Sequence, residues 1–402
     1  MLIQYLDLLY KSLFFTRIHP CPKGAVSLKN QRYYIFSTNN VLPIDTMNIL
    51  FIANAASIHT IRFVEYFVQK KYEVHLISYL PPDAPIPGVI LHILPSLFSN
   101  IFLDFFPRQL YIQKIIARVQ PDLIHAMYVS KFGWHLVPIR KIPTLLTALG
   151  DDILILPHTG LIYFLYTKLA LKKADIIYAV SEHIRQAIIT EYNIPENTVK
   201  NLPIGVDLSV FYPGIVKSPA NSHQIRIFSN RGFRHEYDPK TIIDAVASVH
   251  ASYPDSMLFL KGGGPERQAF EEYVFLQGFD SFIHFLDRTD YSSVADDYRK
   301  TDIFISAAIS DGTPVSMLEA MACGVACVMT DVGGVPEWIR DGHNGLVFPP
   351  KRPDILADKI RFLLDNPDER VKLGNNAQKT IEFRGDWARL MRELEDDYSA
   401  LV

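Results

Sequence analysis

From Asn48 onward, short apolar runs alternate with stretches in which apolar residues recur at helical spacing. The first run, residues 48–52, is almost wholly apolar, which is typical of a strand that is covered on both faces. The helical spacing that follows is carried by Ile61, Phe63, Val64, Phe67 and Val68. Further apolar runs extend the series at residues 73–79, 89–94, 123–126 and 144–147. This alternation predicts a parallel, doubly wound sheet.

A second series of strands begins near Ile225. Helical patterns separate its predicted strands, which cover residues 225–229, 257–260, 282–286, 302–306 and 325–329. Between the two series, residues 201–207 contain a proline and a glycine and suit a linker. The sequence therefore predicts an α/β protein with two Rossmann-like domains. Because such sheets bind ligands at the carboxyl ends of their strands, we expect the two domains to face a central cleft.

Length and composition narrow the function. A chain of 402 residues suits two domains, and a formal net charge of -3 argues against non-specific binding of nucleic acid. The cysteines Cys21, Cys323 and Cys327 form no disulfide framework, which suits a reducing compartment. Cys323 and Cys327 lack further metal ligands nearby, so buried thiols are the better interpretation. No apolar run reaches the roughly 20 residues that span a bilayer, and we expect a cytoplasmic protein.

The first residues of the chain stand apart from this pattern. Residues 1–15 are mostly apolar and aromatic, but they lack a basic leading region and a small-residue cleavage site, which argues against a secretory signal. Residues 1–46 are then either a peripheral or disordered extension, or upstream sequence read from too early a start. We favour the second interpretation because the regular pattern begins at Met47.

Residues 310–324 carry most of the chemical information. Thr313 suits the N-cap of a helix, Pro314 its first position and Gly324 its end. A helix of about ten residues is therefore predicted soon after a strand and the turn at Asp311. Its free amide groups and positive dipole end make an anion site, which we expect to face the cleft.

Two carboxylates flank this helix start. Asp311 lies in the loop before the helix, and Glu319 lies in its second turn. A carboxylate can accept two hydrogen bonds from a vicinal diol, so one could hold sugar hydroxyls and the other ribose hydroxyls on the two sides of a diphosphate. Taken alone, Asp311 would be a turn residue and Glu319 a solvated helix residue. The rest of the segment outweighs that interpretation.

The segment resembles the family 4 retaining glycosyltransferases, which have the GT-B fold. Asp311 and Glu319, with seven residues between them, are similar to the acidic pair of that family, which is usually two glutamates. The surrounding sequence motifs also match the pattern of that family: Ser-Asp-Gly-Thr-Pro, Leu-Glu-Ala-Met-Ala-Cys-Gly and Asp-Val-Gly-Gly-Val-Pro-Glu. The resemblance covers nearly everything after Met47, including residues 174–182, 203–213 and the Gly-rich turn 262–267.

The resemblance implies an activity. It implies transfer of a sugar from a nucleoside-diphosphate sugar to an acceptor hydroxyl with retention of configuration, in the synthesis of cell-surface polysaccharide or glycolipid. The departing phosphate oxygen would serve as the base. No paired-aspartate motif is present, so neither a metal nor another cofactor is expected. The resemblance also implies that the first domain covers residues 47–205 and the donor domain 206–385, and that a last helix at 386–402 crosses back onto the first domain.

Roles in the donor domain follow from the same resemblance. Asp311 is expected to contact the transferred sugar, Glu319 the ribose and Arg231 the diphosphate. The lysine that usually accompanies the arginine is replaced, with Tyr237 at about its place and Arg234 or Lys240 as open substitutes. The remaining donor contacts are expected from Gly312, Thr313, Pro314, Val315 and Gly263.

The first domain departs further from the family pattern. Its opening loop has small residues in place of two glycines, and we expect Ser57 and His59 there to approach the donor. The loop after the strand at 144–147 carries Leu149 at the usual histidine position but keeps the final acid as Asp152, which we expect to be catalytic. His125 also matches the family, although a core role is at least as favoured for it.

Two alternatives remain open from the sequence. One is another GT-B enzyme, such as a sugar-nucleotide epimerase or a phosphorylase, and the other is a non-catalytic sugar-nucleotide-binding subunit. The acidic pair counts against the first, and the retained Asp311, Glu319 and Arg231 count against the second. The acceptor is a sugar or a lipid-linked molecule. Aromatic residues at 97–106 and lysines among aromatics at 161–173 suit core packing, but they also motivate a peripheral contact with the inner face of the membrane.

Overall fold

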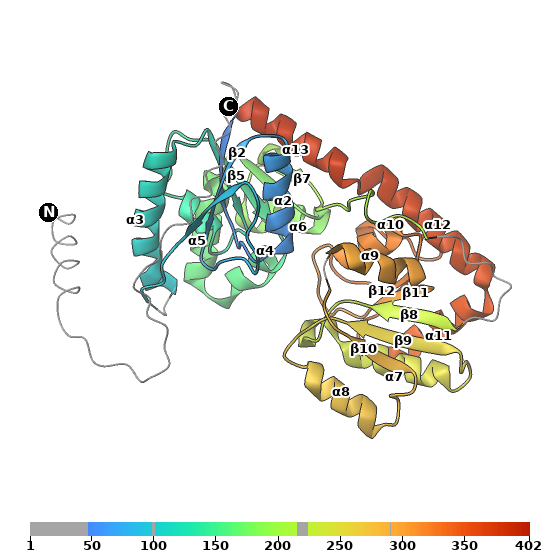
Figure 1. Ribbon diagram of the computed structural model, residues 1–402. Helices are drawn as coiled ribbons and strands as arrows, with labels where there is room; N and C mark the ends of the chain where they lie inside the picture. The colour runs from blue at the N-terminus through green and yellow to red at the C-terminus, as the bar shows by residue number, and fades with distance from the viewer. Residues whose placement is uncertain (1–46, 99–100, 215–223, 290) are drawn as a thin grey trace, which may run out of the picture. The chain divides into compact units, whose positions relative to one another are not determined.

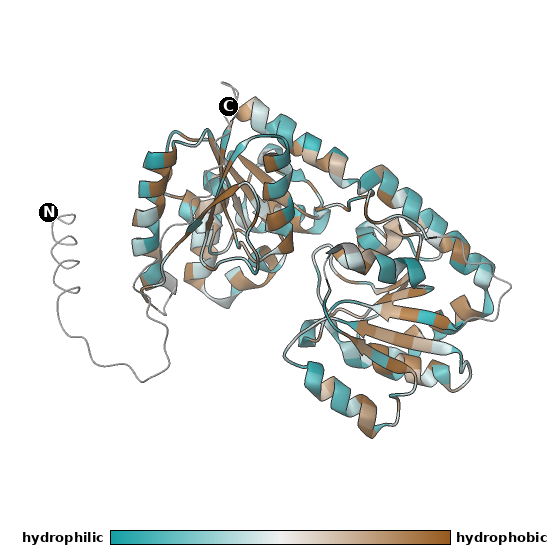
Figure 2. Ribbon diagram, viewed as in Figure 1, coloured by the Kyte–Doolittle hydropathy of each residue, from teal (hydrophilic) through white to brown (hydrophobic). Residues whose placement is uncertain are grey.

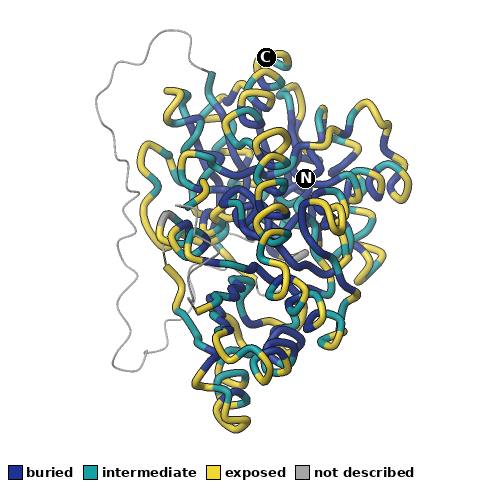
Figure 3. The backbone as a smooth tube through the Cα atoms, turned by 90° about the vertical axis from the view of Figure 1, so that its right-hand side faces the viewer, coloured by how far each residue is buried: buried dark blue, intermediate teal, exposed yellow. Residues whose placement is uncertain are grey.

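A computed structural model describes residues 47–98, 101–214, 224–289 and 291–402, so the predicted extension at 1–46 lies outside it. The described residues form two parallel sheets, each flanked by helices (Figure 1). One sheet has seven strands and the other has six. The strands are coloured mostly as apolar in Figure 2, and in Figure 3 the buried backbone lies mainly in the interior, with exposed backbone around it. This is the two-domain α/β architecture that the sequence predicts.

The first sheet has the order β3-β2-β1-β4-β5-β6-β7. Its strands are β1 (Asn48–Ile52), β2 (Glu73–Ser78), β3 (Val89–Ile93), β4 (Leu123–Met127), β5 (Thr144–Ala148), β6 (Ile176–Ala179) and β7 (Val199–Asn201). Its helices are α2 (Ile58–Gln69), α3 (Ile101–Val119), α4 (Asp151–Leu154), α5 (Leu161–Lys173) and α6 (Glu182–Tyr192). The five strands predicted here are confirmed to within a residue or two. The sequence analysis did not predict β6 or β7 as strands. The three-residue β7, which ends at the start of the predicted linker, carries too short a pattern to be recognised.

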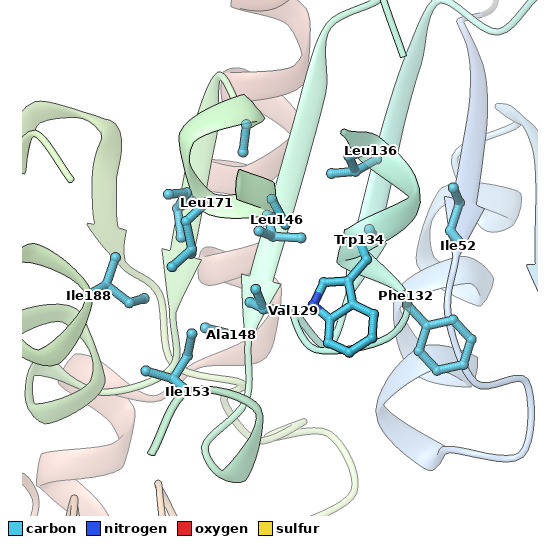
Figure 4. Packing of buried hydrophobic residues seen from close by; sticks show 14 of the residues in the cluster. Ile52, Val129, Phe132, Trp134, Leu136, Leu146, Ala148, Ile153, Leu171 and Ile188 are labelled. Atoms are coloured by element: carbon cyan, nitrogen blue, oxygen red, sulfur yellow. The ribbon is translucent and has the colours of Figure 1, made fainter. Parts of the chain in front are cut away.

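The first sheet has a core on each face. On one face, residues of the strands pack with η1 (Gly133–Leu136), α5 and α6, and Figure 4 shows Trp134, Leu146 and Leu171 converging between these elements. On the other face, the strands pack with α2 and with α13 (Trp387–Leu401). A strand with both faces buried has no polar face, which is why β1 reads as a continuous apolar run.

The second sheet has the order β10-β9-β8-β11-β12-β13. Its strands are β8 (Ile225–Ser229), β9 (Ser256–Lys261), β10 (Ile283–Leu286), β11 (Ile303–Ser306), β12 (Ala326–Thr330) and β13 (Leu346–Phe348). Its helices are α7 (Pro239–His250), α8 (Arg267–Leu276), α9 (Tyr291–Lys300), α10 (Val315–Ala322), α11 (Pro353–Asp365) and α12 (Pro367–Arg384). Short 3-10 helices complete the chain: η2 (Leu156–Thr159), η3 (Glu196–Thr198), η4 (His235–Tyr237) and η5 (Val335–Glu337). All five predicted strands are confirmed, and β13 adds a sixth.

The C-terminal helix α13 packs onto the first sheet. Leu390, Leu394 and Tyr398 are buried in the same core as β1. The Tyr398 ring stacks on Phe67 with centroids 4.8 Å apart. Each fully buried aliphatic side chain contributes roughly 1.5–3 kcal/mol, so this contact is a substantial part of the first core. The boundary between the domains at residues 205 and 206 stays a prediction.

Candidate donor site

The expected donor residues gather where the second sheet changes direction. The strands β8 and β11 are neighbours, but the chain runs outward from them toward opposite edges of the sheet. Arg231 follows the end of β8, and Asp311 follows the end of β11. The loops after two such strands diverge and leave a crevice at the carboxyl edge, which is where open α/β sheets bind their ligands. The topology thus brings together residues that lie 80 positions apart.

Arg231 is held at the start of α10. Its Nη2 donates a hydrogen bond to the carboxylate of Asp311, and its Nη1 donates to Ser316 Oγ over 3.2 Å. Its guanidinium carbon lies 4.5 Å from the centre of the Tyr237 ring. Burial raises the pKa of Asp311, and the charge of Arg231 opposes that rise. The buried Nε of Arg231 has no hydrogen-bond partner among the described residues, so the guanidinium keeps an unused donor.

The helix start differs in detail from the prediction. The helix α10 has eight residues, and Pro314 with extended backbone is its N-cap, so the prediction of Thr313 as N-cap and Pro314 as first helical residue is wrong. The Thr313 hydroxyl instead donates to the carbonyl of Val180 over 3.0 Å, a contact that only the tertiary fold provides. Gly324 follows the last turn with a φ of 69°, as predicted for a helix end. The first amides at the open end of α10 belong to Val315 and Ser316.

Glu319 is buried one turn behind this helix start, with 7% of its surface exposed. Its Oε2 accepts from the Tyr298 hydroxyl over 3.0 Å, and that hydroxyl also lies 3.1 Å from Asn230 Oδ1. Burial raises the pKa of Glu319 to about 7, while the Tyr298 hydroxyl and the charges of Arg62 and Arg231 oppose the rise. Its Oε1 has no hydrogen bond to another described residue. This is therefore no solvated helix residue, and one carboxylate oxygen is open to a ligand.

The Gly-rich turn after β9 lies against the loop after β8. A Cβ on Gly264, whose φ is 154°, would lie 2.2 Å from the carbonyl oxygen of Phe233. A Cβ on Gly232 would lie 2.7 Å from the carbonyl oxygen of Gly263. Glycines are therefore needed to let these two loops meet. Gly263 lies on this turn, and its contact with the donor stays a prediction.

The expected substitutes for the missing lysine are engaged elsewhere. Lys240 donates from α7 to Asp244 on the same helix over 2.5 Å. Arg234 is exposed beside Glu236. The sequence did not single out Lys261, which lies at the end of β9 and lines a small cavity together with Arg231. Its Nζ is 2.6 Å from an oxygen of Asp297, so it too has a protein partner.

The start of α2 in the first domain holds two of the expected residues. Ser57 is the N-cap of α2 and makes no side-chain capping bond. His59 has a buried Nδ1 with no partner among the described residues, and burial together with Arg62 lowers its pKa to about 4. Arg62 itself was missed by the sequence analysis. Its guanidinium lies over the rings of Trp387 and Tyr291 at 4.1 and 5.2 Å, and its charge reaches Glu319.

Asp152 lies just after β5, in the segment where the sequence places it. It is fully buried, its Oδ1 accepts from the amides of Leu149 and Gly150, and its Oδ2 accepts from the amide of Val129. Its carboxylate thus ties together the loops after β4 and β5. Its catalytic role stays a prediction. Burial raises its pKa to about 6 in spite of these bonds.

His125 likewise lies inside the first domain. It is fully buried, its Nδ1 pairs with the Tyr398 hydroxyl, and its Nε2 lies 2.7 Å from Thr147 Oγ1. Both ring nitrogens therefore have partners in the protein. This is the core role that the sequence analysis favoured at least equally.

The described residues contain no group of three or more His, Cys, Asp or Glu side chains that could hold a metal ion. Cys323 and Cys327 are buried free thiols. No helix in the described part of the chain has the length and apolar character to cross a bilayer.

Comparisons with known proteins agree with this geometry. The family model of glycosyl transferases group 1 matches residues 215–380, and the model of glycosyl transferase 4-like proteins matches residues 48–181. An uncharacterized glycosyltransferase of Methanocaldococcus jannaschii is 27% identical over 342 residues, which are 83% of this chain and 91% of that protein. A D-inositol 3-phosphate glycosyltransferase of Corynebacterium kroppenstedtii is 26% identical over 313 residues, covering 71% and 68% of the two chains.

Solved structures share the fold. Sucrose-phosphate synthase from Thermosynechococcus elongatus superimposes with a TM-score of 0.74 at 19% identity, covering 88% of this chain and 99% of that one. Anabaena HepE in complex with UDP-glucose superimposes with a TM-score of 0.72 at 16% identity, covering 88% and 100%. The two-sheet architecture is therefore that of the GT-B glycosyltransferases.

Proposed function

Because the chain belongs to the group 1 glycosyltransferases of the GT-B fold, we propose that it is a retaining enzyme that uses a nucleoside-diphosphate sugar. The observation that carries this proposal is the group of Arg231, Asp311 and Ser316 at the start of α10, with Glu319 buried one turn behind. A cation, a helix N-terminus and two carboxylates are the groups that a sugar diphosphate nucleotide requires.

Each of these protein groups is assigned to one part of the donor: the ribose, the diphosphate or the transferred sugar. The Oε1 of Glu319 accepts hydroxyl protons of the ribose, because it is the open oxygen of a buried carboxylate. Arg231 and the first amides of α10 hold the diphosphate, and their attraction grows as negative charge develops on the leaving group. Asp311 lies beside Arg231 on the loop side and holds the transferred sugar. The bond between the anomeric carbon and the diphosphate breaks, and the acceptor oxygen bonds to that carbon on the same face, which retains the configuration. The departing phosphate oxygen accepts the proton of the acceptor hydroxyl.

Substrates and setting are also proposed. HepE binds UDP and UDP-glucose, so uridine is the first nucleotide to test. The acceptor is a sugar or a lipid-linked sugar of cell-surface polysaccharide or glycolipid synthesis, met at the inner face of the membrane. Neither a metal nor another cofactor is required, and no nucleic acid takes part. An epimerase, a phosphorylase or a non-catalytic subunit is not favoured, because the named relatives are glycosyltransferases.

A thermal-shift screen tests the proposal first. Nucleoside diphosphates and their sugars are added to the purified chain, and the matching donor is expected to raise the melting temperature because it binds the native state alone. Arg231→Ala is expected to abolish the shift, and Arg352→Ala, at an exposed arginine of the same domain, is expected to keep it. Acceptor-dependent release of nucleoside diphosphate then establishes transfer, and NMR of the product gives its anomeric configuration. An inverted product would contradict the retaining mechanism.

A further inference from the structure

The outward faces of α3 and α5 carry a cluster of exposed apolar side chains. We call it the α3/α5 face, and it comprises Leu103, Phe106 and Leu110 on α3 and Leu161, Leu165 and Leu169 on α5. Between 48% and 73% of each of these side chains is exposed. Their spacings of three and four residues place them in one row on each helix. Single exposed leucines are ordinary on protein surfaces, but a contiguous group marks an interaction site.

The helix α3 buries charged residues and exposes apolar ones, which is the reverse of the usual arrangement on a surface helix. Its buried row contains Asp104 and Arg108, which form an ion pair of 2.6 Å inside the protein, together with the buried Ile112. Its exposed row contains leucine and phenylalanine. A surface helix in water normally turns its apolar stripe inward and its charges outward. An outward apolar row opposite a buried ion pair indicates that this row meets something other than water.

The two helices lie side by side on the same face of the first sheet (Figure 1). Phe105 of α3 and Tyr166 of α5 contact each other with ring centroids 5.7 Å apart. Both helices connect strands in the same direction along the sheet, which places them on one face when the crossovers are right-handed. Each begins after the carboxyl end of a strand, and each apolar row lies in the first two-thirds of its helix. The α3/α5 face therefore lies toward the sheet edge at which the reaction is proposed.

The exposed charges on the two helices themselves have one sign. Lys114 and Arg118 are exposed on the second half of α3, and Lys172 is exposed at the end of α5. The only acid of the two helices is the buried Asp104, and residues 153–174 contain no acid at all. The chain as a whole has a net charge of -3, so this basic border is a local feature. Apolar rows bordered by exposed cations match the surface of a bilayer with anionic lipids.

We propose that the α3/α5 face docks onto an anionic membrane and so brings the carboxyl edge of the first sheet to a lipid-linked acceptor. The apolar rows enter the boundary between head groups and acyl chains, while the lysines and arginine contact anionic head groups. The docking itself stands on the surface alone. The identity of the acceptor rests on the proposed glycosyl transfer.

Sedimentation with vesicles tests the docking. The full chain is mixed with phosphatidylcholine vesicles with and without phosphatidylglycerol, and binding to the anionic vesicles is expected to be stronger and to fall with salt. The double variant Leu165→Ser and Leu169→Ser is expected to bind at least about tenfold more weakly, since two apolar side chains no longer enter the bilayer. Phe275→Ser with Leu276→Ser on α8 is the matched control. These side chains are 72% and 70% exposed in the other domain, and their loss is expected to leave vesicle binding intact.

Nucleotide binding separates this proposal from the proposed function. The α5 variant is expected to keep the thermal shift with the donor nucleotide, which also shows that it is folded. Wild-type protein that binds nucleotide but no vesicles would overturn the docking and leave the transferase intact. Equal loss in the α8 variant, undiminished binding in the α5 variant, or a wild-type dimer that the α5 variant abolishes would also overturn it. The last result would assign the face to a second copy of the chain.

Discussion

Glu319 is expected to make the second domain less stable in alkaline solution than a neutral side chain of the same shape would. Burial raises its pKa from 4.5 to about 7, so the folded protein prefers the protonated form. Below the unfolded value both states are protonated and the group has no effect. As the pH rises from 4.5 toward 7, only the unfolded state ionises and the free energy of unfolding falls. Above about 7 the loss is complete, and at about 1.4 kcal/mol for each pH unit between the two values it reaches about 3 kcal/mol.

The perturbation is Glu319→Gln, which removes the ionisation and keeps an oxygen that accepts from Tyr298. At pH 8 the variant is expected to melt several degrees above the wild type, because a domain of this size shifts by roughly 2–4 °C per kcal/mol. At pH 5 the gain is expected to fall to about a quarter of that at pH 8, because the pH is then only half a unit above the unfolded pKa. The same variant is expected to bind the nucleoside diphosphate about one to two decades more weakly, since a charged acceptor of the ribose hydroxyls is lost.

The assay is differential scanning fluorimetry from pH 5 to pH 8, paired with titration calorimetry. Glu272→Gln on α8 is the control, because Glu272 is exposed and its loss should leave both measurements unchanged. A variant that melts below the wild type at pH 8, or gains as much at pH 5, would refute the argument from desolvation. Unchanged nucleotide affinity would refute the ribose contact while leaving the stability argument in place.

Three further outcomes are expected. Arg231→Ala is expected to weaken nucleoside diphosphate binding by about one to two decades and also to slow turnover, which calorimetry and steady-state rates measure; slower turnover at unchanged affinity would remove Arg231 from the ground-state diphosphate contact. Asp311→Ala is expected to lower turnover without weakening binding of the bare nucleotide, because Asp311 pairs with Arg231 in the wild type and its loss leaves that arginine free to contact the diphosphate. Lost nucleotide binding would exchange the roles of Asp311 and Glu319. Activity is expected to survive EDTA, and a complete loss that added metal restores would reveal a metal site.

Sequence alone predicted the architecture because buried parallel strands are recognisable as continuous apolar runs. A strand such as β1 or β12 is covered on both faces, and solvent exclusion makes nearly every position apolar. The sequence motifs around Asp311 and Glu319 indicated the family because they too are local: a loop, a helix start and a helix end occupy consecutive residues. The short strands β7 and β13 were not predicted, because three residues hold too little pattern, and the four-residue β6 was not predicted either.

Tertiary structure decided what each polar group faces. The hydroxyl of Thr313 suits an N-cap by its neighbours in the chain, but the carbonyl of Val180, 133 residues away, takes its hydrogen bond. The sequence does not show that the carboxylate of Asp152 accepts hydrogen bonds from three backbone amides of two loops. The pKa of Glu319 likewise depends on the tertiary fold: burial raises it, while the Tyr298 hydroxyl and the charges of two distant arginines oppose the rise. Hydrophobic periodicity is a property of adjacent residues, whereas hydrogen-bond partners and desolvation depend on which distant segments the fold brings together.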